Sequence, residues 1–272
     1  SGVIMAVLVG VVLLGGIKRI ATVAGKLVPF MALLYITATL IILVTHASQI
    51  PTAVALVVDS AFNGAAATGG FAGATLMLAL RMGIARGIFS NEAGLGSAPI
   101  AHAAAETNSP VRQGTIAMLG TFIDTLIICT MTGLVLIVTG VWSGEPQGAA
   151  MTLAAFTGAL PYGDIVLSLC VALFAFTTML GWSYYGERCA EFLLGPRVIT
   201  PFRILWVIGI FVGTQMSLEL VWKMTDALNG LMAIPNLIAL ILLSPIVFKL
   251  TKEYFDQEKS EQTAQDNSAQ GQ

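Results

Sequence analysis

Polar residues interrupt an otherwise apolar sequence in three places, and these are where chemistry can occur. The first is the stretch 85–106, ARGIFSNEAGLGSAPIAHAAAE, in which Ser, Asn, Glu and several glycines fall within an apolar helix. Ser and Asn compete for backbone hydrogen bonds and glycine tolerates unwound backbone, so the pattern predicts a broken helix. Unwound carbonyls can coordinate a cation, and free N–H groups of the next half-helix can hold a carboxylate. The alternative is a polar loop on the cytoplasmic side of the membrane.

The second place is Asp124, near the middle of the apolar stretch GTFIDTLIICT. An ionisable side chain at membrane depth is costly and normally has a partner. The expected partner is Arg86 or Arg81, and Arg86, Glu92 and Asp124 are predicted to form a buried charge network. Two interpretations stay open at this point: a structural ion pair that joins two helices, or a role in ion passage.

The third place lies at 174–191, where Thr177 and Thr178 are followed by Gly181 and Trp182. Two adjacent hydroxyls can supply the oxygen ligands that a hard cation such as Na⁺ prefers. Gly181 allows a close approach, and Trp182 can form the wall of a small pocket. Threonine can also satisfy its hydroxyl on the carbonyl four residues earlier, which is the purely structural alternative.

The elements that position these residues must be membrane helices. Of 272 residues, 56% are hydrophobic and only 10% are charged, with a mean hydropathy of +0.86, whereas soluble proteins carry about 25% charge. The 13 Lys and Arg are scattered singly, which excludes a nucleic-acid partner. The pattern predicts an all-α transmembrane protein with seven spans in the lipid bilayer: 1–16, 27–45, 70–105, 114–141, 164–187, 203–218 and 226–249. The third is too long for one crossing, so we expect it to be discontinuous.

The connecting segments predict the orientation of the chain. Ten Lys and Arg fall on one side of the predicted spans and only Lys223 on the other, leaving aside Arg81 and Arg86 within the third span. Because cytoplasmic loops collect positive charge, the C-terminus is expected to be cytoplasmic. The segment 46–69 is expected to lie on the extracytoplasmic side, where Pro51 can start a short helix. The polar segment 251–272 is expected to be a tail, disordered from about Glu258.

Several segments together resemble the alanine or glycine:cation symporter family. They are GIFSNEAGLGSAPIAHAAAE, LVGVVLLGGIKRI, LVPFMALLYI, GTFIDTLIICTMTGLVL and GWSYYGERCAE, and the resemblance runs from about residue 3 to 250. It implies a LeuT-type inverted-repeat fold with discontinuous helices. It also implies symport of small neutral amino acids, alanine or glycine, across a bacterial-type plasma (inner) membrane, with Na⁺ as coupling ion and no organic cofactor.

The resemblance also assigns roles to residues. It makes 89–94 the unwound middle of a broken helix and places four side chains or backbone groups beside the substrate: Phe89, Ser90, Asn91 and Gly94. It makes Trp182 a pocket wall. It places Thr177 and Thr178 in a sodium site that is completed by carbonyls of another helix.

Members of that family are longer than this chain. The resemblance therefore implies that residues 1–250 form the later part of a transporter bundle and that the N-terminal half of the same transporter, with the first repeat, is a missing partner. Two alternatives are a channel and an intramembrane protease. The protease alternative rests on PYGD at 161–164 and needs a second aspartate close by, for which Asp124 is the deep candidate.

Overall fold

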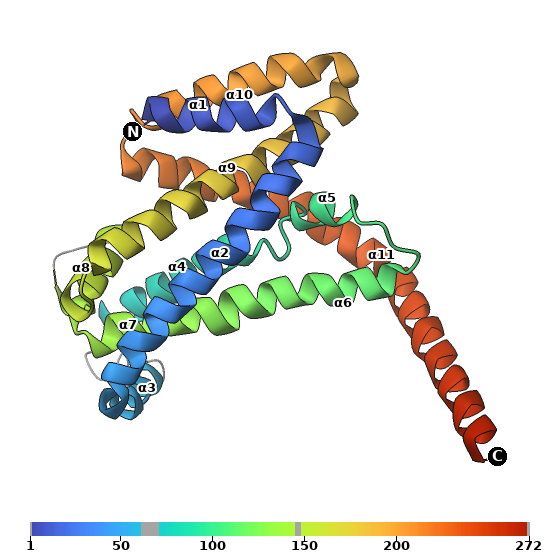
Figure 1. Ribbon diagram of the computed structural model, residues 1–272, viewed down its shortest axis with the longest axis horizontal. Coiled ribbons are helices and arrows are strands. Elements are labelled where there is room, and N and C mark those ends of the chain that lie inside the picture. Colours follow the sequence, from blue (N-terminus) through green and yellow to red (C-terminus); the bar gives the residue numbers. More distant parts are fainter. Residues whose placement is uncertain (1, 61–70, 145–147, 271–272) are drawn as a thin grey trace.

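The computed structural model of the chain describes residues 2–60, 71–144 and 148–270, and every regular element in these ranges is a helix (Figure 1). In chain order the elements are α1 (Gly2–Leu13), α2 (Gly16–Thr45), η1 (Ala47–Gln49), α3 (Ile50–Asp59), α4 (Phe71–Asn91), α5 (Ala98–His102), α6 (Pro110–Thr121), η3 (Phe122–Cys129), α7 (Thr130–Val138), η4 (Val141–Ser143), α8 (Ala149–Ala159), α9 (Gly163–Leu194), η5 (Pro196–Val198), α10 (Ile199–Gly213) and α11 (Leu218–Gln270). The predicted all-α architecture is confirmed over the described ranges.

Five helical stretches of the described chain are long and apolar enough to cross a membrane: Gly16–Thr45, Pro110–Val138, Gly163–Leu194, Pro196–Gly213 and Leu218–Thr263. They correspond to five of the seven predicted spans. The first predicted span, 1–16, forms α1, whose 12 residues are fewer than the about 20 that a crossing requires. The third, 70–105, is divided into α4 and α5, as expected of a discontinuous helix.

The long helices α2 and α9 pack along each other and run through the whole bundle (Figure 1). Both contribute to two separate apolar clusters. In one cluster Ile42 of α2 and Phe156 of α8 are fully buried beside α3 and α7. In the other, Leu13 of α1 packs with Leu180 of α9. These two clusters hold α2 and α9 together near both ends, so we call the α2–α9 pair the frame against which the other helices pack.

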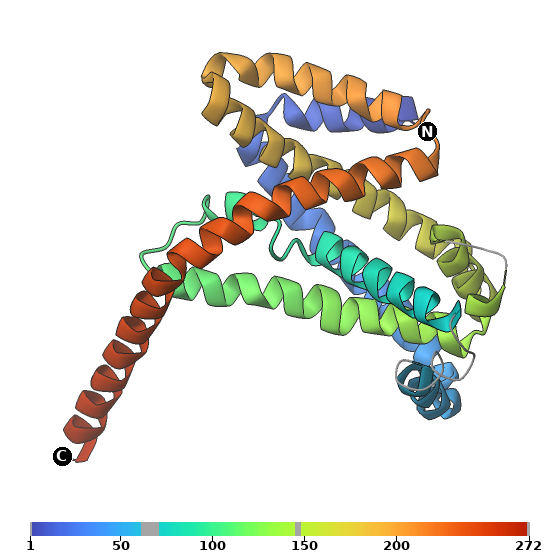
Figure 2. The ribbon, with the colours of Figure 1, turned by 180° about the vertical axis from the view of Figure 1, so that it is seen from behind.

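The helices α1 and α10 lie side by side at one end of this frame (Figures 1 and 2). A buried ion pair joins α10 to α9 there. Arg203 donates from Nε and Nη2 to the two carboxylate oxygens of Glu187, at 2.6 and 3.0 Å. Arg188 adds a third hydrogen bond to Glu187 at 2.9 Å. Since Glu187 is only 3% exposed, water cannot solvate its carboxylate well, and these two arginines stabilise its negative charge instead.

The local helix starts follow the sequence. Pro51 lies in the first turn of α3, as predicted, where its missing N–H costs nothing. Ser109 precedes α6 with extended backbone and its Oγ accepts a hydrogen bond from the N–H of Arg112 at 3.2 Å, the usual N-cap arrangement. Proline follows at the first helical position. These caps fix where the segments on either side of the broken helix begin.

The span Pro110–Val138 is not a regular α-helix. Its middle, η3, is an eight-residue π-helix that joins α6 to α7. A π-helix bonds residue i to i+5 instead of i+4, and such stretches occur often at functional sites. Asp124 stands at the midpoint of this span. No pattern in the sequence predicted this irregularity.

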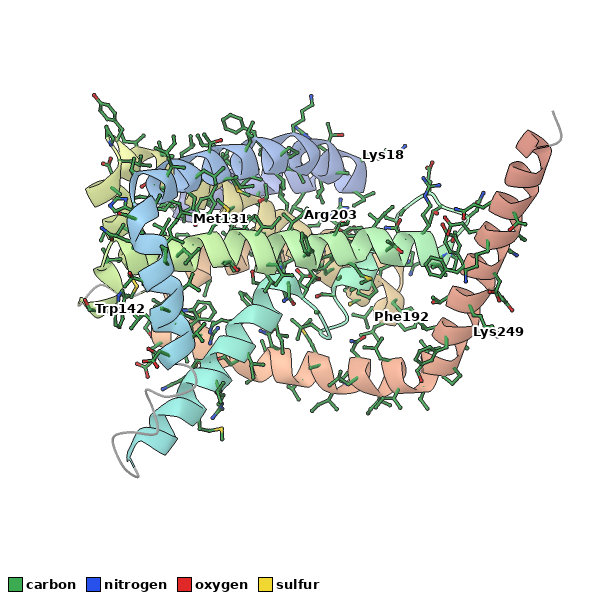
Figure 3. All side chains as sticks on the ribbon, turned by 90° about the horizontal axis from the view of Figure 1, so that it is seen from below. Lys18, Met131, Trp142, Phe192, Arg203 and Lys249 are labelled. Atoms are coloured by element: carbon green, nitrogen blue, oxygen red, sulfur yellow. The ribbon has the colours of Figure 1, made fainter. Side chains whose placement is uncertain are left out.

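The last helix, α11, differs from its predicted form in two ways. It contains Pro235 and Pro245, and its axis changes direction close to Lys249 (Figure 3), because proline removes a backbone hydrogen bond. It also continues as a helix to Gln270, projecting from the bundle (Figure 2), where disorder was expected from Glu258. Residues 251–270 contain no glycine or proline and many Glu, Gln, Lys and Ala, so helix propensity favours this form although the segment buries little.

Candidate functional site

The break in the predicted discontinuous helix lies between α4 and α5. Glu92, Gly94 and Gly96 have φ of 57°, 85° and 82°, in the left-handed region. Glycine adopts that region without strain, whereas Glu92 does so against its preference. The expected unwound stretch was 89–94. In the structure Phe89, Ser90 and Asn91 form the last turn of α4, and the unwound residues are 92–97.

Asn91 explains why the helix persists to that point. Its Oδ1 accepts a hydrogen bond from the N–H of Ala93 at 2.9 Å, which turns the chain immediately after the helix. Within the break, the hydroxyl of Ser97 donates to Oε2 of Glu92 at 2.8 Å. Ser97 and Leu95 are buried, at 1% and 3% exposure. The broken segment is therefore a fixed structural unit.

Gly96 brings the break close to α11. A Cβ built on Gly96 would lie only 3.0 Å from Oδ1 of Asn236. At Gly94, by contrast, the nearest side-chain atom belongs to Leu237 and lies 4.0 Å away. Gly96 thus allows the unwound stretch to pack against α11, while Gly94 serves the turn itself.

An aromatic cluster forms where α4, α9 and α11 meet. The ring of Phe89 lies 6.2 Å from that of Trp182 and 5.8 Å from that of Trp222, centroid to centroid. Trp182 in turn contacts Tyr185 edge-on at 5.9 Å. The structure thus brings together the two predicted pocket residues, Phe89 and Trp182. Trp222 was missed, although it lies four residues before Asp226 and so on the same helix face.

Arg86 has a different partner from the one expected. Its Nη2 donates to both carboxylate oxygens of Asp226 in α11, at 2.8 and 2.7 Å, and its guanidinium lies 3.9 Å from the centroid of the Trp222 ring. Asp124 does not pair with it. The expected charge network of Arg86, Glu92 and Asp124 is therefore divided among three separate sets of contacts. Arg86 instead anchors the broken helix to α11.

Asp124 is surrounded by donors without formal charge. The hydroxyl of Ser90 lies 2.8 and 3.0 Å from its two carboxylate oxygens, and the hydroxyl of Thr125 donates at 3.3 Å. Asn91 Nδ2 donates to Thr125 Oγ1 at 3.0 Å. A carboxylate at the middle of a membrane helix costs about 3 kcal/mol when it is not neutralised. The predicted substrate residues Ser90 and Asn91 are therefore joined directly to η3.

A cavity of about 280 Å³ opens beside Asp124. Helices α2, α7, α8 and α9 and the segment η3 form its walls, and Ser90 of α4 reaches it from the broken helix. Most of its lining is apolar. Its polar lining consists of one carboxylate, four hydroxyls and two thiols: Asp124, Tyr35, Ser90, Thr132, Thr152, Cys129 and Cys170.

The two threonines proposed as cation ligands lie in the middle of α9. Thr177 is buried, and its hydroxyl donates to the carbonyl oxygens of Leu173 and Phe174, at 3.0 and 3.1 Å. This hydrogen bond to the preceding helical turn is the purely structural alternative that the sequence left open for Thr177. The hydroxyl keeps its lone pairs, so the contact orients Thr177 without removing it as an oxygen ligand.

Comparison with known proteins places this geometry in context. The sequence pattern of the sodium:alanine symporter family matches residues 1–268. An uncharacterized transporter of Haemophilus influenzae is 49% identical over 269 residues, which are 98% of this chain and 59% of that protein. The sodium/alanine symporter AgcS of Methanococcus maripaludis is 46% identical over 265 residues, 96% of this chain and 58% of that protein. The amino-acid carrier protein AlsT of Bacillus subtilis is 35% identical over 259 residues, 94% of this chain and 55% of that protein.

These matches bear on two expectations: which part of a transporter the chain represents, and whether it is an enzyme. The chain spans between half and three fifths of the length of these relatives. The family match runs across residues 1–268, so it gives no support to the expected restriction to a C-terminal portion or to a missing N-terminal half. Because the family comprises transporters rather than enzymes, the intramembrane-protease alternative is wrong. The helical architecture, the several apolar spans and the sequence match agree, and the chain belongs to the sodium:alanine symporter family.

Proposed function

We propose that this chain carries out secondary active symport of small neutral amino acids, with alanine and glycine as substrates and Na⁺ as the coupling ion. It acts as a multi-pass protein of a bacterial-type plasma membrane, with residues 1–250 as the transporter bundle and a cytoplasmic C-terminus. Membership in the sodium:alanine symporter family supports this proposal. So does the 46% identity to a protein named as a sodium/alanine symporter.

The observation that carries the proposal is the helix break beside the Phe89–Trp182 pair. In inverted-repeat carriers of the LeuT type, such breaks present backbone N–H and C=O groups to a zwitterionic substrate. Two large rings 6.2 Å apart leave little room for a side chain. Each excess methylene is worth about 1–3 kcal/mol in such a pocket, so selectivity for alanine and glycine is graded. The proposed substrate contacts are Phe89, Ser90, Asn91, Gly94 and Trp182.

The coupling site is proposed at Thr177 and Thr178. Their hydroxyls lie on consecutive residues of α9, and Thr177 is buried and oriented by its own helix. Na⁺ is a hard cation that takes oxygen ligands. Neutral hydroxyls supply these ligands without the desolvation cost of burying a carboxylate beside the ion. No organic cofactor takes part.

Uptake into proteoliposomes tests this function and separates a carrier from a channel. With the reconstituted protein and an inward Na⁺ gradient, radiolabelled alanine is expected to accumulate above its external concentration. An equal K⁺ gradient should give no accumulation. Uptake that only equilibrates alanine, whatever the gradient, would support the channel alternative instead.

Replacing both Thr177 and Thr178 with valine is expected to raise the Na⁺ concentration for half-maximal uptake by about tenfold or more, because the shape persists while two oxygen ligands are lost. Replacing both with serine keeps the oxygens and should change it much less. The measurement is the Na⁺ dependence of initial uptake rates. Equal Na⁺ dependence in the valine and serine proteins would move the coupling site elsewhere.

A further inference from the structure

Glu92 has no role in the proposed function, although it lies in the helix break directly after the proposed substrate contacts of α4. We propose that Glu92 and Tyr185 are positioning residues for the substrate pocket. Their hydrogen bond holds the rings of Phe89 and Trp182 at a fixed separation, and this separation limits the size of the side chain that the transporter accepts. The inference rests on the proposed function, since it assigns these residues to the same pocket.

The first observation is the backbone conformation of Glu92. Its φ of 57° lies in the left-handed region, which glycine adopts without strain and glutamate does not. The two other left-handed positions of the break are glycines, Gly94 and Gly96. A strained residue persists only where its surroundings hold it, and such residues gather at functional sites. The side chain of Glu92 must therefore make contacts that glycine could not replace.

The contacts of the Glu92 side chain join the break to itself and to α9. Oε2 of Glu92 accepts a hydrogen bond from the hydroxyl of Ser97 at 2.8 Å, which ties together the two ends of the unwound stretch 92–97. Ser97 is only 1% exposed, so this bond is shielded from water. The phenol of Tyr185 on α9 is a second hydrogen-bond donor to Glu92. The carboxylate of Glu92 is thus held both from within the break and from α9.

Tyr185 connects this carboxylate to the aromatic cluster. It lies three residues after Trp182, so both side chains share one face of α9, and their rings meet edge-on with centroids 5.9 Å apart. The ring of Trp182 lies 6.2 Å from that of Phe89, which precedes Glu92 by three residues at the end of α4. The end of α4 and α9 are therefore connected at two points, by the two rings and by the carboxylate and the phenol.

Two connections restrict these segments more than one can. Packing of apolar groups is largely non-directional, so the ring contact alone lets α4 and α9 rotate or separate slightly about it. A hydrogen bond is directional and fixes a second point. A pocket wall that is held in place rejects excess side-chain atoms, whereas a wall that can move accepts them at a lower cost. Loss of the bond between Glu92 and Tyr185 is therefore expected to relax the choice of substrate before it unfolds the chain.

The test compares substrates of different size in proteoliposomes under an inward Na⁺ gradient. It measures the KM of radiolabelled alanine and the inhibition constant of valine, whose side chain is larger, against alanine uptake. Tyr185→Phe removes the phenol oxygen and keeps the ring beside Trp182, and Glu92→Ala removes the carboxylate. Tyr184→Phe is the matched control, because Tyr184 lies next to Tyr185 on α9 but its ring faces Arg188, whose guanidinium carbon is 5.4 Å from the ring centroid.

Tyr185→Phe is expected to lower the ratio of the valine inhibition constant to the alanine KM by about fivefold, and Glu92→Ala by at least as much. Glu92→Gln retains an accepting oxygen and is expected to keep most of the selectivity. Tyr184→Phe should leave the ratio unchanged. The ratio does not depend on the amount of folded protein, so a merely structural role would lower the maximal rate without changing it.

A second measurement needs no transport. Protein labelled with fluorotryptophan gives a fluorine NMR signal for each tryptophan, and Trp182→Phe identifies the signal of Trp182. Glu92→Ala is expected to broaden or split that signal, because the ring is no longer held through Tyr185, whereas Tyr184→Phe should not. Where the Glu92→Ala protein does not fold, Glu92→Gln and Tyr185→Phe are measured in its place.

An unchanged selectivity ratio in Tyr185→Phe overturns the inference, as does an unchanged Trp182 signal after loss of the Glu92–Tyr185 bond. Equal changes in Tyr184→Phe and Tyr185→Phe overturn it as well. A protein that shows the altered Trp182 signal but accumulates no alanine would contradict the proposed function and leave the positioning of Trp182 by Glu92 and Tyr185 standing.

Discussion

Replacing Arg203 with alanine is expected to lower the free energy of unfolding by about 3 kcal/mol, because it leaves a buried carboxylate with half of its partners. The side chain of Glu187 is 4% exposed, and Arg203 binds both of its oxygens. Arg188 remains as the only other partner that the described residues give it. The measurement is reversible unfolding of the purified protein in mixed micelles.

A double-mutant cycle makes this prediction specific to the pair. Adding Glu187→Gln to Arg203→Ala removes the stranded charge, so the double variant is expected to be more stable than the sum of the single effects. The exposed pair of Glu219 and Lys223, 78% and 73% exposed at 2.6 Å, is the control. Removing Lys223 should cost less than about 1 kcal/mol. Equal costs at the two pairs would mean that burial of Glu187 is not what makes its pair matter.

Replacing Gly163 with alanine is expected to lower the free energy of unfolding by about 3 kcal/mol through overpacking. Gly163 begins α9 and is buried against the end of α8. A Cβ built there would overlap the carbonyl oxygen of Phe156 and lie 3.2 Å from the backbone nitrogen of Thr157. Backbone in a helix end cannot move aside as a side chain can, so the connection between α8 and α9 must open.

Gly181 provides the matched control within the same helix. Apart from its chain neighbours and the backbone of its own helix turn, no atom of the described residues lies within 4 Å of a Cβ at this position. The close approach that its sequence context suggested is therefore not made there. Gly181→Ala is expected to raise stability by about 0.5–1 kcal/mol, because alanine loses less backbone freedom than glycine on helix formation. Destabilisation at both glycines would show that the cost at Gly163 is not a matter of contact with α8.

The sequence predicted the parts of the site that depend on local patterns. The break in the third span follows from Ser90, Asn91 and two nearby glycines, whose backbone preferences act within a few residues. The meeting of Phe89 and Trp182 came from a resemblance across most of the chain, and the structure places their rings in contact. The unwound stretch begins three residues later than expected, at Glu92 instead of Phe89. Asn91 sets this position, because its Oδ1 accepts a hydrogen bond from the N–H of Ala93 and turns the chain just after the helix.

The parts that were missed depend on contacts between distant segments. Arg86 and Asp226 are 140 residues apart, and no periodicity within one segment records which acid an arginine will reach. The helical form of 251–270 was missed for the opposite reason. Low hydrophobicity indicates that a segment buries little, but it does not measure the helix propensity of its residues.

The π-helical stretch η3 has a geometric consequence for the two halves of its span. Each residue advances an α-helix by about 100° around its axis, and the wider π turn alters that angular phase between Asp124 and Thr132. With this offset, Asp124 meets Ser90 on α4 while Thr132 meets Tyr35 on α2. Deleting one residue from η3 would restore the angular spacing of an ordinary α-helix and so rotate Thr132 relative to Asp124. Either the contact of Asp124 with Ser90 or the contact of Thr132 with Tyr35 would then be lost. The π-helical stretch thus fixes the rotation of its span at which one half contacts the broken helix and the other half contacts α2.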